Sequence, residues 1–255
     1  MLDRTKRTVT LTEAGEYFLE EAKLSLEHAE RAKAVARKVS RGELGTVRIG
    51  HVHSTPFSGL LTKLTSAFRR YAPDIHLEFV EGDPVELMAS IVERDLDLGF
   101  IRLPHEDVPS EIAIQTVFQE KILLALRDDH WLAQKKKIRC ADLSGENFIL
   151  YHRRDGKSPL DGHRKAIAEK GGFRLDAVHK AQSIIIVIGL VAAGSGVALV
   201  PESLHYMNVP SVVFRPLADI ELISELAVAY RRDERSPAVS WFLADLSTGN
   251  FDRQK

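Results

Sequence analysis

From residue 46 onward, short runs of apolar residues alternate with stretches in which apolar residues recur every three or four positions. The runs are typical of buried strands, and the stretches are typical of amphipathic helices. The expected strands are 46–50, 75–80, 96–101, 121–126, 148–151, 175–179, 197–200 and 225–230. The expected helices are 57–71, 84–94, 161–170, 184–193 and 238–246. Strands separated by helices in this way predict right-handed βαβ units on a parallel sheet.

The alternation begins a second time near Val117, so we expect two similar α/β lobes. The pattern leaves open whether the last strand and the last helix return to the first lobe. Gly42 and Gly45 separate this α/β region from an N-terminal segment and are expected to end a helix and form a linker.

The N-terminal segment predicts a short strand at 8–11 and a long helix at 13–41. The spacing Thr10-x-x-Glu13 matches a capping box, and Thr12 is an alternative N-cap. Along the helix, mostly small residues recur at alternating spacings of three and four and form one seam. They are Leu11, Gly15, Phe18, Ala22, Ser25, Ala29, Ala32, Ala36 and Val39.

Such a seam favours close approach between two helices. We therefore predict a dimerisation helix, and the contact residues expected in it are Phe18, Ala22, Ala29, Ala32 and Ala36. The alternative is a helix that packs against its own domain, because periodicity alone does not say which partner covers the stripe.

Composition and charge restrict the classes of protein. With 44% hydrophobic and 28% charged residues, the chain resembles an ordinary globular protein. A formal net charge of -1 means that the bulk of the chain is not a nucleic-acid-binding surface, so any contact with DNA must be local. The single cysteine, Cys140, excludes an internal disulfide. No secretory signal or membrane span is visible, which predicts a cytoplasmic protein.

Sequence evidence for an enzyme, a metal or a cofactor is weak. His51 and His53 share one face of an expected strand, but no acidic or cysteine partner stands at zinc-like spacing. The stretch 194–196, Gly-Ser-Gly, follows a helix and precedes a strand, so it is expected to cap the helix rather than bind phosphate. Basic neighbours at 135–139 predict a lowered thiol pKa for Cys140, which leaves a redox role as an alternative.

Three motifs, in order and at the right spacing, resemble those of the LysR-type transcriptional regulators. The stretch 5–15 resembles the wing and linker-helix start of that family, with its R-x-V-x-L-T-x-A-G hallmark. The stretch 94–99 resembles the G-x-L-D-hydrophobic-G motif, with Arg94 in place of the usual glycine. The stretch 189–201 matches the pattern G-L-V-A-A-G-x-G, four hydrophobic residues and proline.

The resemblance implies an α/β fold with a bilobal effector domain similar to a periplasmic binding protein, whose βα lobes are joined by crossover strands. It implies a remnant of a winged helix-turn-helix at 1–12 and a linker helix at 13–41. Lobe 1 is expected at 46–115 and 224–255, and lobe 2 at 116–223. The implied function is transcription regulation by a homodimer or homotetramer that binds promoter DNA and a small effector, which is expected to be a carboxylate or an aromatic.

The family's recognition helix would precede the first residue of this chain. Arg4, Lys6 and Arg7 are expected to contact DNA phosphates, which positions a protein without reading bases. We therefore expect the 255-residue chain alone to bind a specific operator poorly.

The effector is expected in the cleft between the lobes, beyond the ends of the strands. Hydroxyls after the first strand, a helix start, an arginine after the third strand and a second-lobe loop are the candidate contacts. They are Ser54, Thr55, Pro84, Arg102, Tyr151, Ser158 and Pro159. Pro84 departs from the small hydroxyl residue that many members have at this position.

Each candidate has a structural alternative. Ser54 is also a possible N-cap, Arg102 is also suited to a structural ion pair, and Arg153 and Arg154 are expected in a solvated basic loop. Two other functions remain open: a free-standing solute-binding protein and an enzyme on the same fold. No residue set here assembles a catalytic mechanism.

Overall fold

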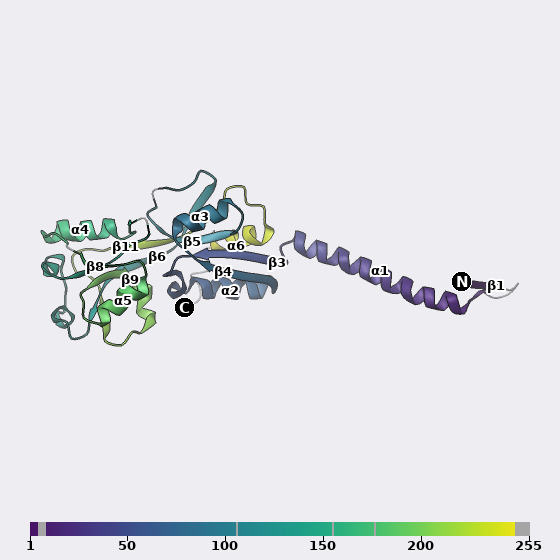
Figure 1. The fold of residues 1–255 in the computed structure, drawn as a ribbon, viewed down its shortest axis with the longest axis horizontal. Helices are drawn as coiled ribbons and strands as arrows, with labels where there is room; N and C mark the ends of the chain where they lie inside the picture. The colour runs from purple at the N-terminus through teal and green to yellow at the C-terminus, as the bar shows by residue number, and fades with distance from the viewer. Residues whose placement is uncertain (5–8, 106, 155, 176, 248–255) are drawn as a thin grey trace.

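A computed structural model describes residues 1–4, 9–105, 107–154, 156–175 and 177–247. It has an α/β body from which one long helix, α1 (Glu13–Ser40), projects (Figure 1). Strands β1 (Leu2–Arg4) and β2 (Val9–Leu11) pair in an antiparallel ribbon at the far end of that helix. None of the helices in the described ranges is both long enough and apolar enough to cross a bilayer.

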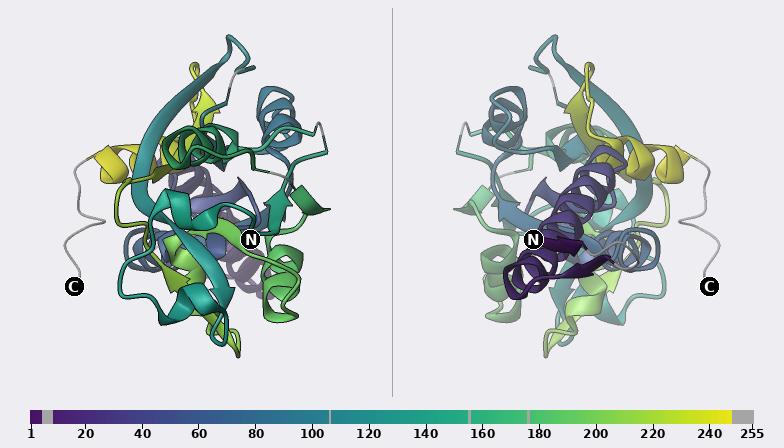
Figure 2. Two further views of the ribbon diagram at one scale, coloured as in Figure 1. Left: turned by 90° about the vertical axis from the view of Figure 1, so that its left-hand side faces the viewer. Right: turned by 90° about the vertical axis from the view of Figure 1, so that its right-hand side faces the viewer.

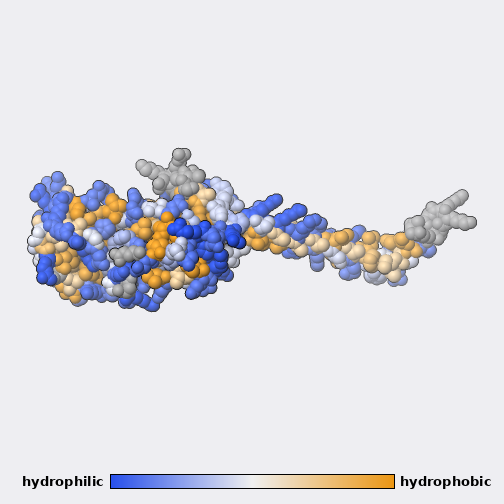
Figure 3. Space-filling view, turned by 90° about the horizontal axis from the view of Figure 1, so that it is seen from above, coloured by the Kyte–Doolittle hydropathy of each residue, from blue (hydrophilic) through white to orange (hydrophobic). Residues whose placement is uncertain are grey.

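Helix α1 starts at Thr12, whose hydroxyl accepts a hydrogen bond from the amide of Gly15 at 3.1 Å. The alternative N-cap is therefore confirmed, and the capping box from Thr10 is wrong. Gly15 is the one residue of α1 that is buried, so the helix does not pack along its length on its own domain. The space-filling view in Figure 3 shows apolar residues running along this exposed helix.

The first lobe has three parallel strands, in the order β4 (Asp74–Glu81), β3 (Leu44–His51) and β5 (Leu98–Leu103). Helices α2 (Leu60–Tyr71) and α3 (Pro84–Val92) connect them. The expected βαβ units on a parallel sheet are present in these three strands, and the rest of the sheet is antiparallel. Strand β11 (Ile223–Arg231) lies antiparallel between β5 and β6 (Ile112–Arg127), because it returns from the second lobe.

The second lobe is built around the far half of β6. Strands β9 (Ala198–Pro201) and β10 (Val212–Arg215) pair antiparallel with it, and β7 (Phe148–Tyr151) pairs parallel with β8 (Ala177–Ala181). Helices α4 (Asp161–Gly171) and α5 (Ile184–Ala192) complete the lobe. Two strands, β6 and β11, run from one lobe to the other, and Figure 1 shows them side by side.

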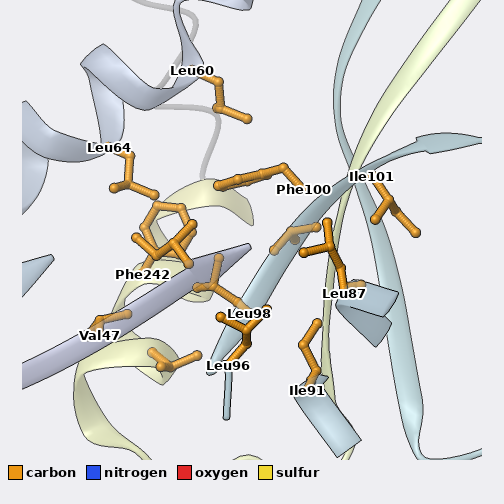
Figure 4. Close-up of a cluster of buried hydrophobic side chains, with 14 of the residues drawn as sticks. Val47, Leu60, Leu64, Leu87, Ile91, Leu96, Leu98, Phe100, Ile101 and Phe242 are labelled. Carbon is orange, nitrogen blue, oxygen red and sulfur yellow. The ribbon is translucent and has the colours of Figure 1, made fainter. Parts of the chain in front are cut away.

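Each lobe has its own hydrophobic core. The first core collects residues from β3, α2, α3 and β5, and α6 (Pro237–Ser247) completes it (Figure 4). In α6, Phe242 stacks on Phe68 of α2 with ring centroids 5.8 Å apart. The last strand and helix therefore return to the first lobe, which the hydrophobic pattern alone left open. Two further clusters, around β6, α4 and α5, form the second lobe's interior.

The two ends of the described chain lie apart from the lobe junction. Figure 1 shows α1 and the β1–β2 ribbon on the side of the body away from the second lobe, and in the right-hand view of Figure 2 they lie in front of the body. Arg4 belongs to β1, but its side chain is not described, and Lys6 and Arg7 lie outside the described residues. The expected phosphate contacts therefore remain predictions.

Candidate functional site

A small pocket lies between the two lobes, with walls from both. Its lining comes from the ends of β3, β5, β7 and β9, the first residues of α3 and α5, and the loop before α4. These residues are Val52, His53, Ser54, Pro84, Arg102, Tyr151, Arg153, Pro159, Leu160, Ile184 and Pro201. The room inside is about 40 Å³, enough for a few waters at about 10–15 Å³ each.

Five of the seven residues expected at the effector site line this pocket: Ser54, Pro84, Arg102, Tyr151 and Pro159. The fold brings them together because strands β3, β5 and β7 end at the same junction. The other two lie outside the lining. Thr55 is fully buried, and Ser158, just before α4, accepts from the amide of Leu160 at 3.2 Å.

Arg102 is the centre of a buried polar network at the pocket wall. Its Nε donates to Ser54 Oγ at 2.8 Å, its Nη1 donates to Ser224 Oγ at 2.8 Å, and its Nη2 pairs with Glu120 Oε1 at 2.6 Å. Glu120 in turn accepts from the amide of Ser203 at 2.5 Å. The network connects the first lobe, both crossover strands and the second lobe.

The charges in this network compensate one another. Arg102 is 5% exposed and Glu120 is 7% exposed. Burial lowers the pKa of Arg102 below its ordinary value, and the adjacent Glu120 carboxylate opposes part of this lowering. The structural ion pair that was one alternative for Arg102 is therefore present. Glu120 and Ser224 lie in strands and Ser203 lies in a 3-10 helix. None of the three had a signal in the sequence, because an isolated polar residue does not reveal its partners.

The loop after β7 differs from expectation. Arg153 is 7% exposed and lines the pocket, so its assignment to a solvated loop is wrong. Arg154 does reach solvent, and its Nη1 lies 3.0 Å from Glu86 Oε1 of α3. Lys157 lies 3.5 Å from Asp107 of the first lobe. Two exposed ion pairs thus join this second-lobe loop to the first lobe.

His51, the last residue of β3, and His53, two residues later, have different surroundings. His51 is buried, and its Nδ1 lies 3.3 Å from the carbonyl of Val52. His53 lines the pocket, and its Nε2 lies 3.4 Å from Glu81 Oε1. In the described ranges, no group of three or more histidine, cysteine or acidic side chains is placed to hold a metal ion.

Cys140 is in a different environment from the one its basic neighbours suggest. The thiol is buried, and burial together with Asp219 raises its pKa to about 11. The predicted lowering of this pKa is wrong, because burial outweighs the basic neighbours: Lys135 pairs with Asp142 at 2.7 Å, and Lys136 and Lys137 are exposed. A thiol with a raised pKa is a poor nucleophile at neutral pH, which argues against a redox role.

We expect Cys140 to be unreactive toward 5,5′-dithiobis(2-nitrobenzoate) in the native protein at pH 7. Its thiolate fraction is small with a pKa of about 11, and the sulfur is shielded from the reagent. In about 6 M guanidinium chloride the same thiol should react within minutes, as an unfolded cysteine does. Fast stoichiometric labelling of the native chain at neutral pH would contradict the buried environment.

Comparisons with known proteins agree with one another. The family model of the LysR substrate binding domain matches residues 40–249. The Hca operon transcriptional activator HcaR of Escherichia coli (strain K12) is 34% identical over 249 residues, covering 96% of this chain and 81% of that protein. CbnR, a LysR family transcriptional regulator, has a similar fold, with a TM-score of 0.82 at 22% identity over 96% of this chain and 83% of CbnR.

A further similar structure is the BenM effector binding domain with its effector benzoate. It covers 81% of this chain and 93% of that domain, with a TM-score of 0.68 at 25% identity.

Arg94, which stands where the family motif has glycine, has φ of 68°, a backbone conformation that glycine adopts without strain.

Proposed function

The chain belongs to the LysR family of transcriptional regulators, and we propose that it regulates transcription in response to a small anionic effector bound between its lobes. The observation that carries the proposal is the pocket formed by both lobes with Arg102, Ser54 and Arg153 in its wall. The relatives named above are regulators and not enzymes, which agrees with a sensing role.

The polar groups of the pocket fit a carboxylate. A guanidinium has five N–H donors, and Ser54, Ser224 and Glu120 engage one donor each on Arg102. Two donors are left for a ligand. Ser54 accepts from Arg102, so its own hydroxyl hydrogen is available to an anion. Arg153 adds a second guanidinium from the other lobe, and arginine suits the planar geometry of a carboxylate.

The remaining walls are apolar and fit a hydrocarbon or aromatic body. Val52, Leu160 and Ile184 contribute side chains, and Pro159 and Pro201 contribute rings. A site with mostly apolar walls and few polar groups is typical of small-molecule recognition. An aromatic or aliphatic monocarboxylate satisfies both parts of the pocket.

Entry of the effector requires the lobes to separate. The room of about 40 Å³ is far below the volume of ordinary ligand sites, about 300–1,000 Å³. The ion pairs from Arg154 and Lys157 are exposed, and such pairs contribute about 0–1 kcal/mol each, so they oppose opening only weakly. An effector that prefers one lobe arrangement then shifts the population toward it.

We propose that α1 transmits this shift to DNA-binding heads. The helix leaves the body with its apolar seam uncovered, and Phe18 is 55% exposed. Ala29, Ala32 and Ala36 are exposed, and Ala22 is partly buried. A second copy that packs along this seam would form the homodimer, and contacts between dimers would form a homotetramer.

Replacing Ser54 with alanine should weaken binding of a carboxylate effector by about ten- to hundredfold, since a hydrogen bond to a charged group contributes about 1.5–3 kcal/mol. A thermal-shift screen of aromatic and aliphatic carboxylates, with benzoate first, would identify a ligand, because binding to the folded state raises its stability. Isothermal titration of the wild type and the Ser54→Ala variant then measures the difference.

Ser58→Ala is the matched control, because Ser58 ends the same 3-10 turn but lies outside the pocket lining. We expect this variant to bind the ligand as the wild type does. If Ser54→Ala binds every stabilising carboxylate with unchanged affinity, the anion site does not include the pocket described here.

A further inference from the structure

A second and larger hollow shares Pro159 with the effector pocket. Pro159 lines both spaces, but the second one measures about 580 Å³ against about 40 Å³. The larger volume falls within the range of ordinary small-molecule sites, about 300–1,000 Å³. Its walls come from the segment after β5, from α4 and from β11, so both lobes and a crossover strand contribute.

The walls of this hollow are mostly apolar. Leu103 and Pro104 follow Arg102 at the end of β5, and Leu222 and Ile223 lie at the start of β11. His163 of α4 adds a flat ring whose Nε2 lies 2.8 Å from the carbonyl of Ile223. A carbonyl only accepts, so this nitrogen carries the proton and donates it. The Nε2 hydrogen of His163 is therefore already hydrogen-bonded to the wall of the hollow.

Glu225 is the charged group of the hollow, and its position is fixed by neutral donors. Gln119 Nε2 donates to its Oε1 at 2.7 Å, and Thr116 Oγ1 donates to its Oε2 at 3.3 Å. Among the ion pairs of the described residues, no lysine or arginine neutralises this carboxylate. The nearby guanidinium of Arg102 is paired with Glu120 instead. A half-buried carboxylate held in place without a counter-ion attracts a cation.

We propose that this hollow is a second ligand site, which binds a small organic amine. The ammonium group would lie against the Glu225 carboxylate, and the hydrocarbon part would lie against Leu103, Pro104 and Leu222. The charge preference is opposite to the one proposed for the effector pocket, where Arg153 and the remaining donors of Arg102 favour an anion. The two spaces therefore select different ligands although they share Pro159.

Benzylamine is a suitable probe, because it joins an ammonium group to an apolar ring. Titration calorimetry on the full chain at pH 7 should show saturable binding of benzylamine. Benzyl alcohol, which has the same ring without the charge, should bind about tenfold more weakly or worse. Glu225→Gln should reduce benzylamine affinity by about ten- to hundredfold while leaving the affinity for benzyl alcohol within about twofold.

Glu221→Gln is the matched control. Glu221 lies four residues before Glu225, is exposed, pairs with Lys121 at 3.7 Å and lies outside the hollow. This variant should bind benzylamine with wild-type affinity. The proposal is overturned if the wild type shows no saturable binding of benzylamine at millimolar concentration, or if Glu225→Gln binds it as tightly as Glu221→Gln does. If Glu225→Gln folds poorly, the wild type alone still tests the proposal, because equal affinities for benzylamine and benzyl alcohol would show that the ammonium charge is not recognised.

Discussion

Replacing Glu120 with alanine lowers the free energy of unfolding by about 3–5 kcal/mol, the range expected when one partner of a buried ion pair is removed. The carboxylate pairs with Arg102 at 2.6 Å and accepts from the amide of Ser203 at 2.5 Å. Without it, the guanidinium of Arg102 stays buried with no counter-charge. Urea unfolding monitored by circular dichroism measures the change, provided that the m-value stays constant.

Two further variants separate the buried charge from a general loss of contacts. Exchanging both partners for apolar residues, in the double variant Glu120→Leu with Arg102→Met, should recover much of the lost stability, because no isolated charge is left. Asp233→Ala removes an exposed partner of Arg94, 3.2 Å away, and should cost less than about 1 kcal/mol. Equal effects of Glu120→Ala and Asp233→Ala would show that burial does not determine the contribution of the pair.

Gly196→Ala should be the second severe substitution and should lower the free energy of unfolding by about 2–4 kcal/mol. Gly196 has φ of 153°, and a Cβ atom there would lie 2.2 Å from the carbonyl oxygen of Asn147. The backbone conformation contributes about 1 kcal/mol and the overlap about 1–3 kcal/mol. The same carbonyl accepts from the amide of Val197 at 2.8 Å, so moving it also disturbs the link between β7 and β9.

Gly189→Ala provides the control within the same motif. Gly189 lies inside α5, and an added Cβ would meet no atom within 4 Å. Alanine is the better helix former by about 1 kcal/mol, so this variant should be as stable as the wild type or slightly more stable. Thermal or urea unfolding compares the two variants, and a loss in Gly189→Ala as large as in Gly196→Ala would be inconsistent with the close contact at Asn147.

Most of the secondary structure was predictable from the hydrophobic pattern. The expected strand at 148–151 coincides with β7, and the helix at 161–170 differs from α4 by one residue. Both are bounded by turn residues that end the periodicity. Strands β1 and β10 were missed, and β6 was shortened. Strand β10 has no alternation, and β6 extends from Ile112, nine residues before the expected start, because its first half is stabilised by pairing with β11.

Part of the pocket was also predictable, because strand ends and helix starts are visible in a sequence. Ser54 follows β3, Pro84 begins α3 and Arg102 lies near the end of β5, and the fold places all three in the pocket lining. Arg153 was misplaced, since nothing in a basic loop indicates that one of its arginines turns inward. The partner of Arg102 was not predictable either, because Glu120 lies 18 positions away on a different strand.

The sequence by itself determined the alternation of strands and helices, the start of α1 at one of two threonines, and membership of the LysR family through three local motifs. These depend on short-range periodicity and capping, which neighbouring residues specify. The tertiary structure alone decided that β11 and α6 return to the first lobe, that Arg102 and Glu120 neutralise each other, and that Cys140 is shielded. Each of these depends on burial and on contacts between distant residues, and so on the arrangement of the two lobes around β6 and β11.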